Sequence, residues 1–179
     1  MDIIPFYKKT NTEWSLTNYD LSVIYYKILE QGLLKRLFYD GSALSTEAFI
    51  AKMKDPGVKL FLGFHKGEIA LLSFLTTFDQ KTAQGHFTSL KINAEINIVK
   101  EGKYFVNQLL NMKREDTYYF DTFYGIVPVT NRAAIRFAER CGMSKGCVIP
   151  KFCFNYFEQK SVDGQILYIV RGENDENIQ

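Results

Sequence analysis

The sequence is poor in the residues that build metal sites and disulfide frameworks. Its 179 residues include three cysteines and two histidines. Cys141, Cys147 and Cys153 form no C-x-x-C pair, and His65 and His86 lie far from them in the sequence. A structural zinc site and a disulfide framework are therefore both disfavoured. Three reduced thiols are typical of a cytoplasmic protein.

Long apolar runs and a strong net charge are also missing. No apolar run approaches the roughly 20 residues that a membrane-spanning helix needs. The first residues, MDIIPFYKK, carry an acid at position 2 and too short an apolar stretch for a signal peptide. The net charge is +2 and no basic run exceeds two residues, so charge does not indicate a nucleic-acid partner. We therefore expect a cytoplasmic protein that binds neither a membrane nor nucleic acid.

Aromatic side chains, in contrast, are abundant. The chain has 15 Phe and 11 Tyr, and 46% of its residues are hydrophobic, which suits a thick core or an aromatic-lined cleft. A chain of 179 residues fits one domain that buries about 70% of its unfolded surface. We expect a single domain over residues 1–172 and a flexible acidic tail over residues 173–179.

Two helices are predicted in the first third of the chain. Asp20 can cap the first, and apolar residues then recur at helical spacing: Leu21, Ile24, Tyr25, Ile28 and Leu29. Gly32 is a point of interruption, after which LLKRLF continues the helical pattern. Ser45 or Thr46 opens a second helix through EAFIAKMK, which the turn residues DPG end.

The hydrophobic pattern then changes to a period of two, which is typical of strands. In VKLFLGFH, alternate apolar residues share one face: Val58, Leu60, Leu62 and Phe64. Residues 69–78 predict a second, central strand, residues 79–85 a loop, and residues 86–92 a third strand. We expect these three strands to be consecutive and antiparallel.

The second half of the chain alternates between helices and strands. Residues 100–113 predict a helix, and the nearly continuous apolar run over residues 118–127 predicts a strand covered on both faces. A helix is predicted over residues 130–142, followed by two strands over residues 146–157 and 164–171. The order α-α-β-β-β-α-β-α-β-β, with room for a short N-terminal strand near Trp14, predicts an α/β fold with a mixed sheet and helices on both faces.

The helix over residues 130–142 has well-defined ends. Thr130 or Asn131 can cap its first turn, because either side chain accepts a hydrogen bond from an unpaired helix amide. Gly142 suits the left-handed residue that follows a helix. A narrow face of apolar residues, most of them small, allows close approach to a sheet: Ala134, Ile135, Ala138 and Cys141. Taken alone, these features describe a well-formed surface helix after a central strand.

The same stretch, NRAAIRFAERCGM, resembles the motif that GNAT-superfamily N-acetyltransferases carry after their fifth strand, roughly N-x-x-A-x-x-x-Y-x-x-x-G-F. Asn131, Ala134 and Gly142 match this motif, and Met143 stands for its Phe. The element order from about residue 20 to residue 171 also fits, so the resemblance implies a GNAT-like fold. In that family the fourth and fifth strands splay apart, the pantetheine arm of acetyl-CoA lies between them, and the Asn contacts the cofactor.

Two departures mark the chain as a divergent relative. The family's Tyr, often the acid that protonates the departing thiolate, falls on Ala138, as in members that resemble phage-encoded ones. The family's pyrophosphate loop, V-x-P-x-x-[RQ]-x-x-G-x-[GA], falls on Ile92, Ala94, Asn97, Lys100 and Gly102. Only Gly102 matches, so phosphate binding relies on the helix start and on the charges of Lys100 and Lys103. An ordinary solvated helix start is the alternative.

The resemblance implies an acetyl-CoA-dependent N-acetyltransferase in which an amine attacks the acyl group directly. It assigns cofactor binding and oxyanion stabilisation to the backbone amides of Leu90, Lys91 and Ile92. His86 is the candidate base, because an ordinary imidazole accepts a proton near neutral pH. Tyr124 is the candidate acid that replaces the missing Tyr.

Other side chains are further candidates for chemistry at the site. Glu95 is a second candidate for the base, and Asp121 is a carboxylate within an aromatic strand, where a perturbed pKa is expected. The cysteines are expected in the core, because no local Cys/His pairing supports thiol catalysis.

Two other functions remain open from the sequence. One is a GNAT-like domain without catalysis that serves as a binding or assembly module, which Ala138 and the altered loop favour. The other is an unrelated α/β domain that binds a small molecule. The acceptor of an active enzyme is a small-molecule or peptide amine, and aromatic residues on the expected substrate side favour an uncharged or aromatic one: Tyr25, Tyr26, Phe152 and Tyr156. A homodimer is the commonest assembly for such a protein.

Overall fold

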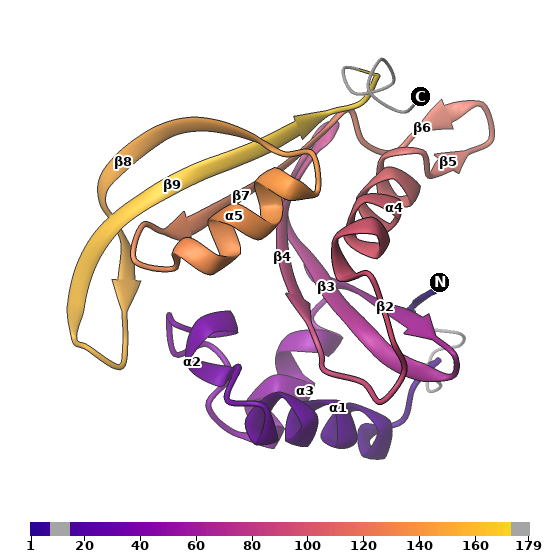
Figure 1. Cartoon of the computed structure of the whole chain (residues 1–179), viewed down its shortest axis with the longest axis horizontal. Helices are drawn as coiled ribbons and strands as arrows, with labels where there is room; N and C mark the ends of the chain where they lie inside the picture. The colour runs from indigo at the N-terminus through magenta and orange to yellow at the C-terminus, as the bar shows by residue number, and fades with distance from the viewer. Residues whose placement is uncertain (8–14, 173–179) are drawn as a thin grey trace. The chain divides into compact units, whose positions relative to one another are not determined.

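The computed structural model describes residues 1–7 and 15–172 and has a mixed seven-stranded sheet (Figure 1). The strand order is β1-β2-β3-β4-β7-β9-β8, with β4 and β7 parallel and β7 and β9 antiparallel. The predicted α/β class with a mixed sheet is therefore confirmed. The predictions of a strand near Trp14 and of a tail over residues 173–179 lie outside the described residues.

The described residues divide into two compact units, while the single domain over residues 1–172 stays a prediction. The first unit comprises Met1–Thr76, His86–Ile96 and Asn155–Lys160. The second comprises Thr77–Gly85, Asn97–Phe154 and the segment from Ser161 onward. The chain passes between the units within the long strand β3 and again within β4.

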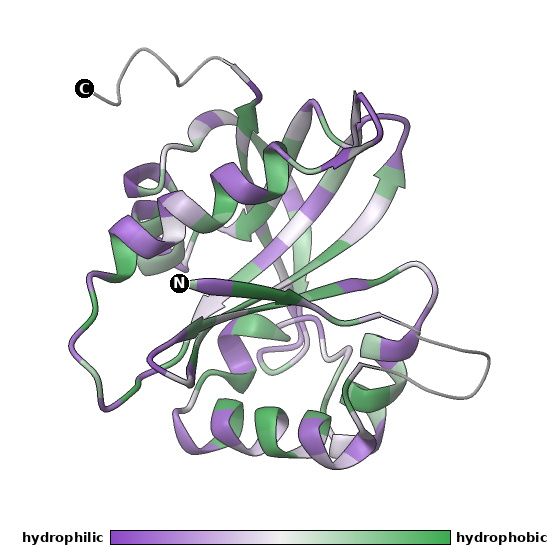
Figure 2. Ribbon diagram, turned by 90° about the vertical axis from the view of Figure 1, so that its right-hand side faces the viewer, coloured by the Kyte–Doolittle hydropathy of each residue, from purple (hydrophilic) through white to green (hydrophobic). Residues whose placement is uncertain are grey.

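The first unit packs helices on antiparallel strands. Its strands are β1 (Asp2–Pro5), β2 (Lys59–His65) and most of β3 (Glu68–Asp79). Its helices are α1 (Asn18–Glu30), α2 (Leu34–Leu37) and α3 (Thr46–Lys54). Figure 2 shows apolar and polar residues alternating around these helices, the pattern of helices that bury one face.

The N-terminus of α1 corrects one prediction. Thr17, not Asp20, is the N-cap, and Asp20 is the third helical residue. The Thr17 side chain accepts from the Asp20 amide, and the Asp20 carboxylate accepts from the Thr17 amide at 2.7 Å. This capping box satisfies two backbone donors at once, so it is preferred over a simple Asp cap.

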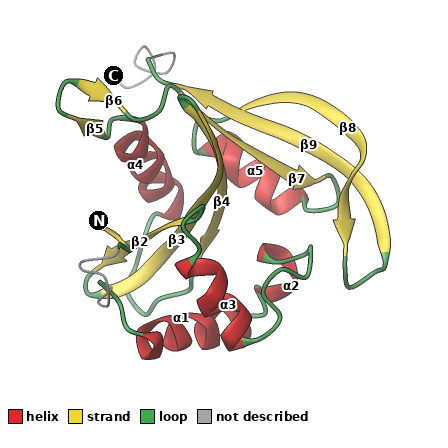
Figure 3. Ribbon diagram, turned by 180° about the vertical axis from the view of Figure 1, so that it is seen from behind, coloured by secondary structure: helices red, strands yellow, loops and turns green. Residues whose placement is uncertain are grey.

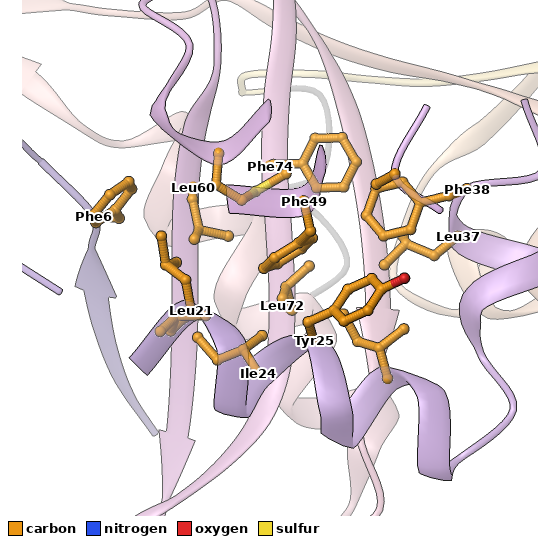
Figure 4. Close-up of a cluster of buried hydrophobic side chains, with 14 of the residues drawn as sticks. Phe6, Leu21, Ile24, Tyr25, Leu37, Phe38, Phe49, Leu60, Leu72 and Phe74 are labelled. Carbon is orange, nitrogen blue, oxygen red and sulfur yellow. The ribbon is translucent and has the colours of Figure 1, made fainter. Parts of the chain in front are cut away.

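The core of the first unit combines aliphatic side chains with a cluster of aromatic rings (Figure 4). Phe38 stacks on Phe74 with ring centroids 5.7 Å apart and meets Phe49 edge-on at 5.9 Å. Tyr25 is 2% exposed and packs against Phe49, so it belongs to this core. The expectation that Tyr25 lines a substrate surface is therefore wrong. Its neighbour Tyr26 is exposed, because successive residues of a helix are turned by about 100° around its axis.

The second unit contains the C-terminal half of the sheet and two helices (Figure 3). Its elements include part of β4 (Thr82–Ser89), α4 (Ile98–Leu110), β7 (Thr122–Pro128), α5 (Arg132–Arg140), β8 (Ser144–Asn155) and β9 (Lys160–Val170). A separate two-stranded hairpin is formed by β5 (Lys113–Arg114) and β6 (Thr117–Tyr118).

Three predicted strands begin at the wrong residues. The strand predicted over residues 164–171 is β9, which already starts at Lys160. The predicted loop over residues 79–85 is largely strand, because β3 extends to Asp79 and β4 already starts at Thr82. Only two residues connect them, and Gln80 adopts the positive φ of 49° that a tight turn needs. The predicted strand over residues 118–127 is divided between β6 and β7.

Candidate active site

The parallel pairing of β4 with β7 is short. It covers three residue pairs, from Thr82 with Thr122 to Gln84 with Tyr124. β4 is eight residues long and β7 is seven, so the ladder covers less than half of either strand. Just past it, a Cβ on Gly125 would lie 3.3 Å from the Gly85 carbonyl oxygen, so glycine permits the backbones to stay close there.

The residues that follow β4 donate their amides to two different partners. The Leu90 amide donates to the Ala70 carbonyl of β3 at 2.8 Å. The Lys91 amide donates to Gln31 Oε1 at 2.7 Å, and Gln31 Nε2 donates to the Lys91 carbonyl at 3.1 Å. Of the amides expected to bind the cofactor, that of Leu90 is therefore already bonded to β3, and that of Lys91 is bonded to Gln31.

The start of α4 is capped by a side chain. Asn97 Oδ1 accepts from the Lys100 amide at 3.2 Å. Lys100 and Lys103 are exposed one turn apart, so both charges lie near the positive end of the helix dipole. In the alignment with the family's loop, Asn97 takes the Arg/Gln position, and here it works as a helix cap.

Gly102 is buried against α5. A Cβ at this position would lie 2.6 Å from Cys141 Sγ and 3.0 Å from Phe137 Cζ. The missing side chain therefore allows α4 and α5 to pack closely, which is a structural reason for glycine that the sequence did not reveal. Burial raises the pKa of the Cys141 thiol to about 11, so this cysteine is not a thiolate nucleophile near neutral pH.

Asn131 joins β7 to α5, and the predicted helix ends are confirmed. Its amide donates to the Pro128 carbonyl at 2.8 Å, and its Oδ1 accepts from the Ala134 amide at 3.3 Å. At the other end, Gly142 has a φ of 100°, and the Met143 amide donates to the Ala138 carbonyl, which forms a Schellman motif.

His86 lies on β4 in the first unit and is largely buried. Its ring stacks on Phe74 with centroids 4.5 Å apart, and its Nε2 lies 3.2 Å from Thr76 Oγ1 in a hydrogen bond. Burial, assisted by the positive charge of Lys52, lowers the pKa of His86 to about 4, although Asp40 opposes the shift. The imidazole is thus neutral at physiological pH but only weakly basic.

The remaining candidates lie in the second unit. Tyr124 is partly buried and pairs across the sheet with Gln84 on one side and Tyr168 on the other. Asp121 forms an ion pair with Arg171, whose hydrogen bond lowers the pKa of that carboxyl. Asp121 therefore stays ionised and ties the start of β7 to the end of β9.

The described residues contain neither a metal site nor a membrane-spanning helix. Within residues 1–7 and 15–172, no three His, Cys, Asp or Glu side chains come together in a way that could hold a metal ion. Among the helices of the same part of the chain, none is long and apolar enough to cross a membrane.

Comparison of the sequence with known proteins finds no match, whereas comparison of the structure finds similar solved structures. No family model and no curated protein matches the sequence. RimL, a ribosomal alpha-N-protein acetyltransferase solved with coenzyme A, aligns with a TM-score of 0.65 at 12% identity, over 92% of this chain and 97% of that one. Aminoglycoside acetyltransferase AAC(6')-Ib, solved with coenzyme A and kanamycin, aligns with a TM-score of 0.66 at 10% identity, over 92% and 96% of the two chains.

A third solved structure gives the same result. Spermidine N-acetyltransferase from Vibrio cholerae, solved with CoA and spermine, aligns with a TM-score of 0.63 at 15% identity, over 87% of this chain and 92% of that one. This chain therefore has the fold of GNAT N-acetyltransferases over most of its length, and the fold implied by the motif around Asn131 is confirmed.

Proposed function

We propose that this chain is an acyl-CoA-dependent N-acyltransferase that moves an acetyl group from acetyl-CoA to an amine. The observation that carries the proposal is the fold, which covers about nine-tenths of the chain and is shared with acetyltransferases whose names give different amine acceptors.

The residues that would hold the cofactor fit its chemistry at two places. The backbone of Lys91 already pairs with an amide, that of Gln31, so the amides of a pantetheine arm match its donor and acceptor. The start of α4 offers helix amides with Lys100 and Lys103 beside them, which suits a pyrophosphate. Asn131, at the start of α5, is proposed to contact the cofactor as well.

When bound, acetyl-CoA supplies an acyl group on a thiol that leaves readily, so the amine nitrogen forms the new C–N bond as the C–S bond breaks. The chain must take one proton from the amine and return one to the sulfur. His86 is proposed for the first task because it is neutral near pH 7, and Tyr124 for the second because a phenol can donate. A pKa near 4 makes His86 a weak base, so this assignment requires an amine that has already lost its extra proton.

A second function is favoured by one specific observation. Ala138 lies in α5 where the family motif has Tyr, and its methyl group cannot exchange a proton. If no other group replaces that Tyr, the chain is a GNAT-like module that binds acetyl-CoA without turnover. The same fold and the same cofactor contacts support both readings, so only turnover separates them.

The test is acetylation of a panel of amines by the purified chain with acetyl-CoA. Spermidine, kanamycin and a peptide with a free N-terminus represent three classes of acceptor. Products are measured by mass spectrometry, because the exposed Cys147 would react with a thiol reagent used to detect released coenzyme A. Acetylation of at least one amine, reduced in the variants His86→Ala and Tyr124→Phe, supports the enzyme. Acetyl-CoA binding without acetylation of any amine supports the module.

A further inference from the structure

The side chain of Gln31 pairs with the backbone of Lys91 in both directions. Gln31 Oε1 accepts from the Lys91 amide at 2.7 Å, and Gln31 Nε2 donates to the Lys91 carbonyl at 3.1 Å. Gln31 is the C-cap residue of α1, and it lies 60 residues away from Lys91 in the sequence. Both residues belong to the first unit, so the contact lies within one compact body.

This contact lies on the edge of the extended chain that faces away from β3. The Leu90 amide donates to Ala70 on β3 at 2.8 Å. In an extended chain, the backbone groups of successive residues point to opposite sides. The amide and carbonyl of Lys91 therefore face the side that β3 does not occupy, and the Gln31 amide is what they meet there.

A primary amide can imitate a neighbouring strand. In an antiparallel sheet, a hydrogen-bonded residue pair exchanges one N–H···O bond in each direction. The Gln31 amide gives Lys91 the same two bonds with a single side chain. The pantetheine arm carries two amides in an extended chain, so it too offers one donor and one acceptor to such a residue.

We propose that Gln31 is a displaceable cap on the segment that follows β4, which yields the Lys91 backbone to the pantetheine amides of acyl-CoA. The inference rests on the proposed function, because it takes acyl-CoA to be the ligand. Exchange of one amide for another costs little, since Lys91 is exposed, Gln31 is partly exposed, and neither bond involves a charged group. Gln31 thus protects a strand edge in the free protein and competes with the cofactor for it.

The test is calorimetric titration of acetyl-CoA into the wild type and two variants, Gln31→Ala and Gln31→Met. The Met variant keeps the length of the side chain but removes the amide. Both variants should bind acetyl-CoA about 5- to 30-fold more tightly, because the competing hydrogen bonds are gone; a tenfold change equals about 1.4 kcal/mol. Glu30→Ala, an exposed change at the end of the same helix, should leave the affinity unaltered.

A second ligand shows which half of the cofactor Gln31 affects. The nucleotide half, 3′-phospho-ADP, has no amide, so its affinity should be the same in the wild type and in both Gln31 variants. Tightening of both ligands alike would overturn the proposal, because the substitution would then act on the whole protein.

The outcomes separate the inference from the proposed function. If the wild type binds acetyl-CoA and the Gln31 variants bind it equally or more weakly, the cap is overturned and the proposed function stands. If neither the wild type nor the variants bind acetyl-CoA, both are overturned. Should the variants fail to fold, NMR of the wild type decides. The chemical shifts of the Gln31 side-chain amide should move toward those of a solvent-exposed amide when acetyl-CoA is added. Unchanged chemical shifts would contradict the cap.

Discussion

The imidazole of His86 lies between the aromatic core and a polar neighbour, Thr76, and this position sets its charge. Its pKa falls from 6.5 to about 4, chiefly through burial. The folded protein therefore holds a neutral ring at pH values where the unfolded chain binds a proton. The contribution of His86 to the free energy of unfolding is therefore fully present above pH 6.5 and is lost as the pH falls toward 4.

This shift predicts acid sensitivity. Between pH 6.5 and 4 the free energy of unfolding should fall by about 3 kcal/mol on account of His86. The variant His86→Phe keeps the stack on Phe74 but has no group to titrate, so its stability should lack that part of the decline. Urea unfolding of both proteins at a series of pH values measures the difference, and parallel curves would contradict the assignment.

The close packing around Gly102 leads to a second prediction for a single residue. Alanine favours a helix over glycine by about 1 kcal/mol, but its Cβ would lie 2.6 Å from Cys141 Sγ. Crowding in a packed interior costs about 1–3 kcal/mol, so Gly102→Ala should destabilise the protein despite the better helix former. Chemical unfolding measures the loss.

The control for this prediction removes the crowded atom. In a Cys141→Ala background the sulfur is absent, so Gly102→Ala should cost less there than in the wild type. Equal costs in the two backgrounds would show that the contact with Cys141 does not explain the glycine.

At the scale of single elements, the N-cap of α5 separates a structural role from a binding role. Asn131→Ala removes the cap on the Ala134 amide and should cost about 1 kcal/mol of stability. Asn131→Asp keeps an oxygen in the same place, so stability should stay near that of the wild type. If the Asn amide also contacts acetyl-CoA, the Asp variant should bind the cofactor more weakly while remaining stable. Unfolding and calorimetry together test this, and an unaltered affinity in the Asp variant would restrict Asn131 to capping.

The elements that the sequence predicted well are those whose ends are local. Ser45 caps α3, and Asn131 and Gly142 bound α5, because each cap forms with residues only a few positions away. The start of β4 was missed because Thr82–Gly85 are mostly polar and the turn before them uses Gln80 instead of glycine. The contact of Gln31 with Lys91 joins residues 60 positions apart, so no local pattern could indicate it.

In the candidate site, too, only the features with a local sequence signal could be predicted. The motif around Asn131 predicted the helix and, through resemblance, the fold. It could not reveal that Gly102 is required by helix packing or that His86 is stacked in a core, because both depend on neighbours brought together only by folding.

At the scale of the whole molecule, the central claim is that the fold binds acyl-CoA. Anything that binds the folded state and not the unfolded chain raises stability, and a ligand at 100 times its dissociation constant adds about 2.7 kcal/mol. Binding is the first requirement of both the enzyme and the module, so it is tested before the acceptor is known.

The most direct measurement is thermal unfolding of the full chain over a series of acetyl-CoA concentrations, with acetate as the control ligand. The fold and the strand-edge amide site predict a midpoint that rises continuously with the logarithm of acetyl-CoA concentration and does not respond to acetate. A midpoint that stays constant up to millimolar acetyl-CoA would contradict the account.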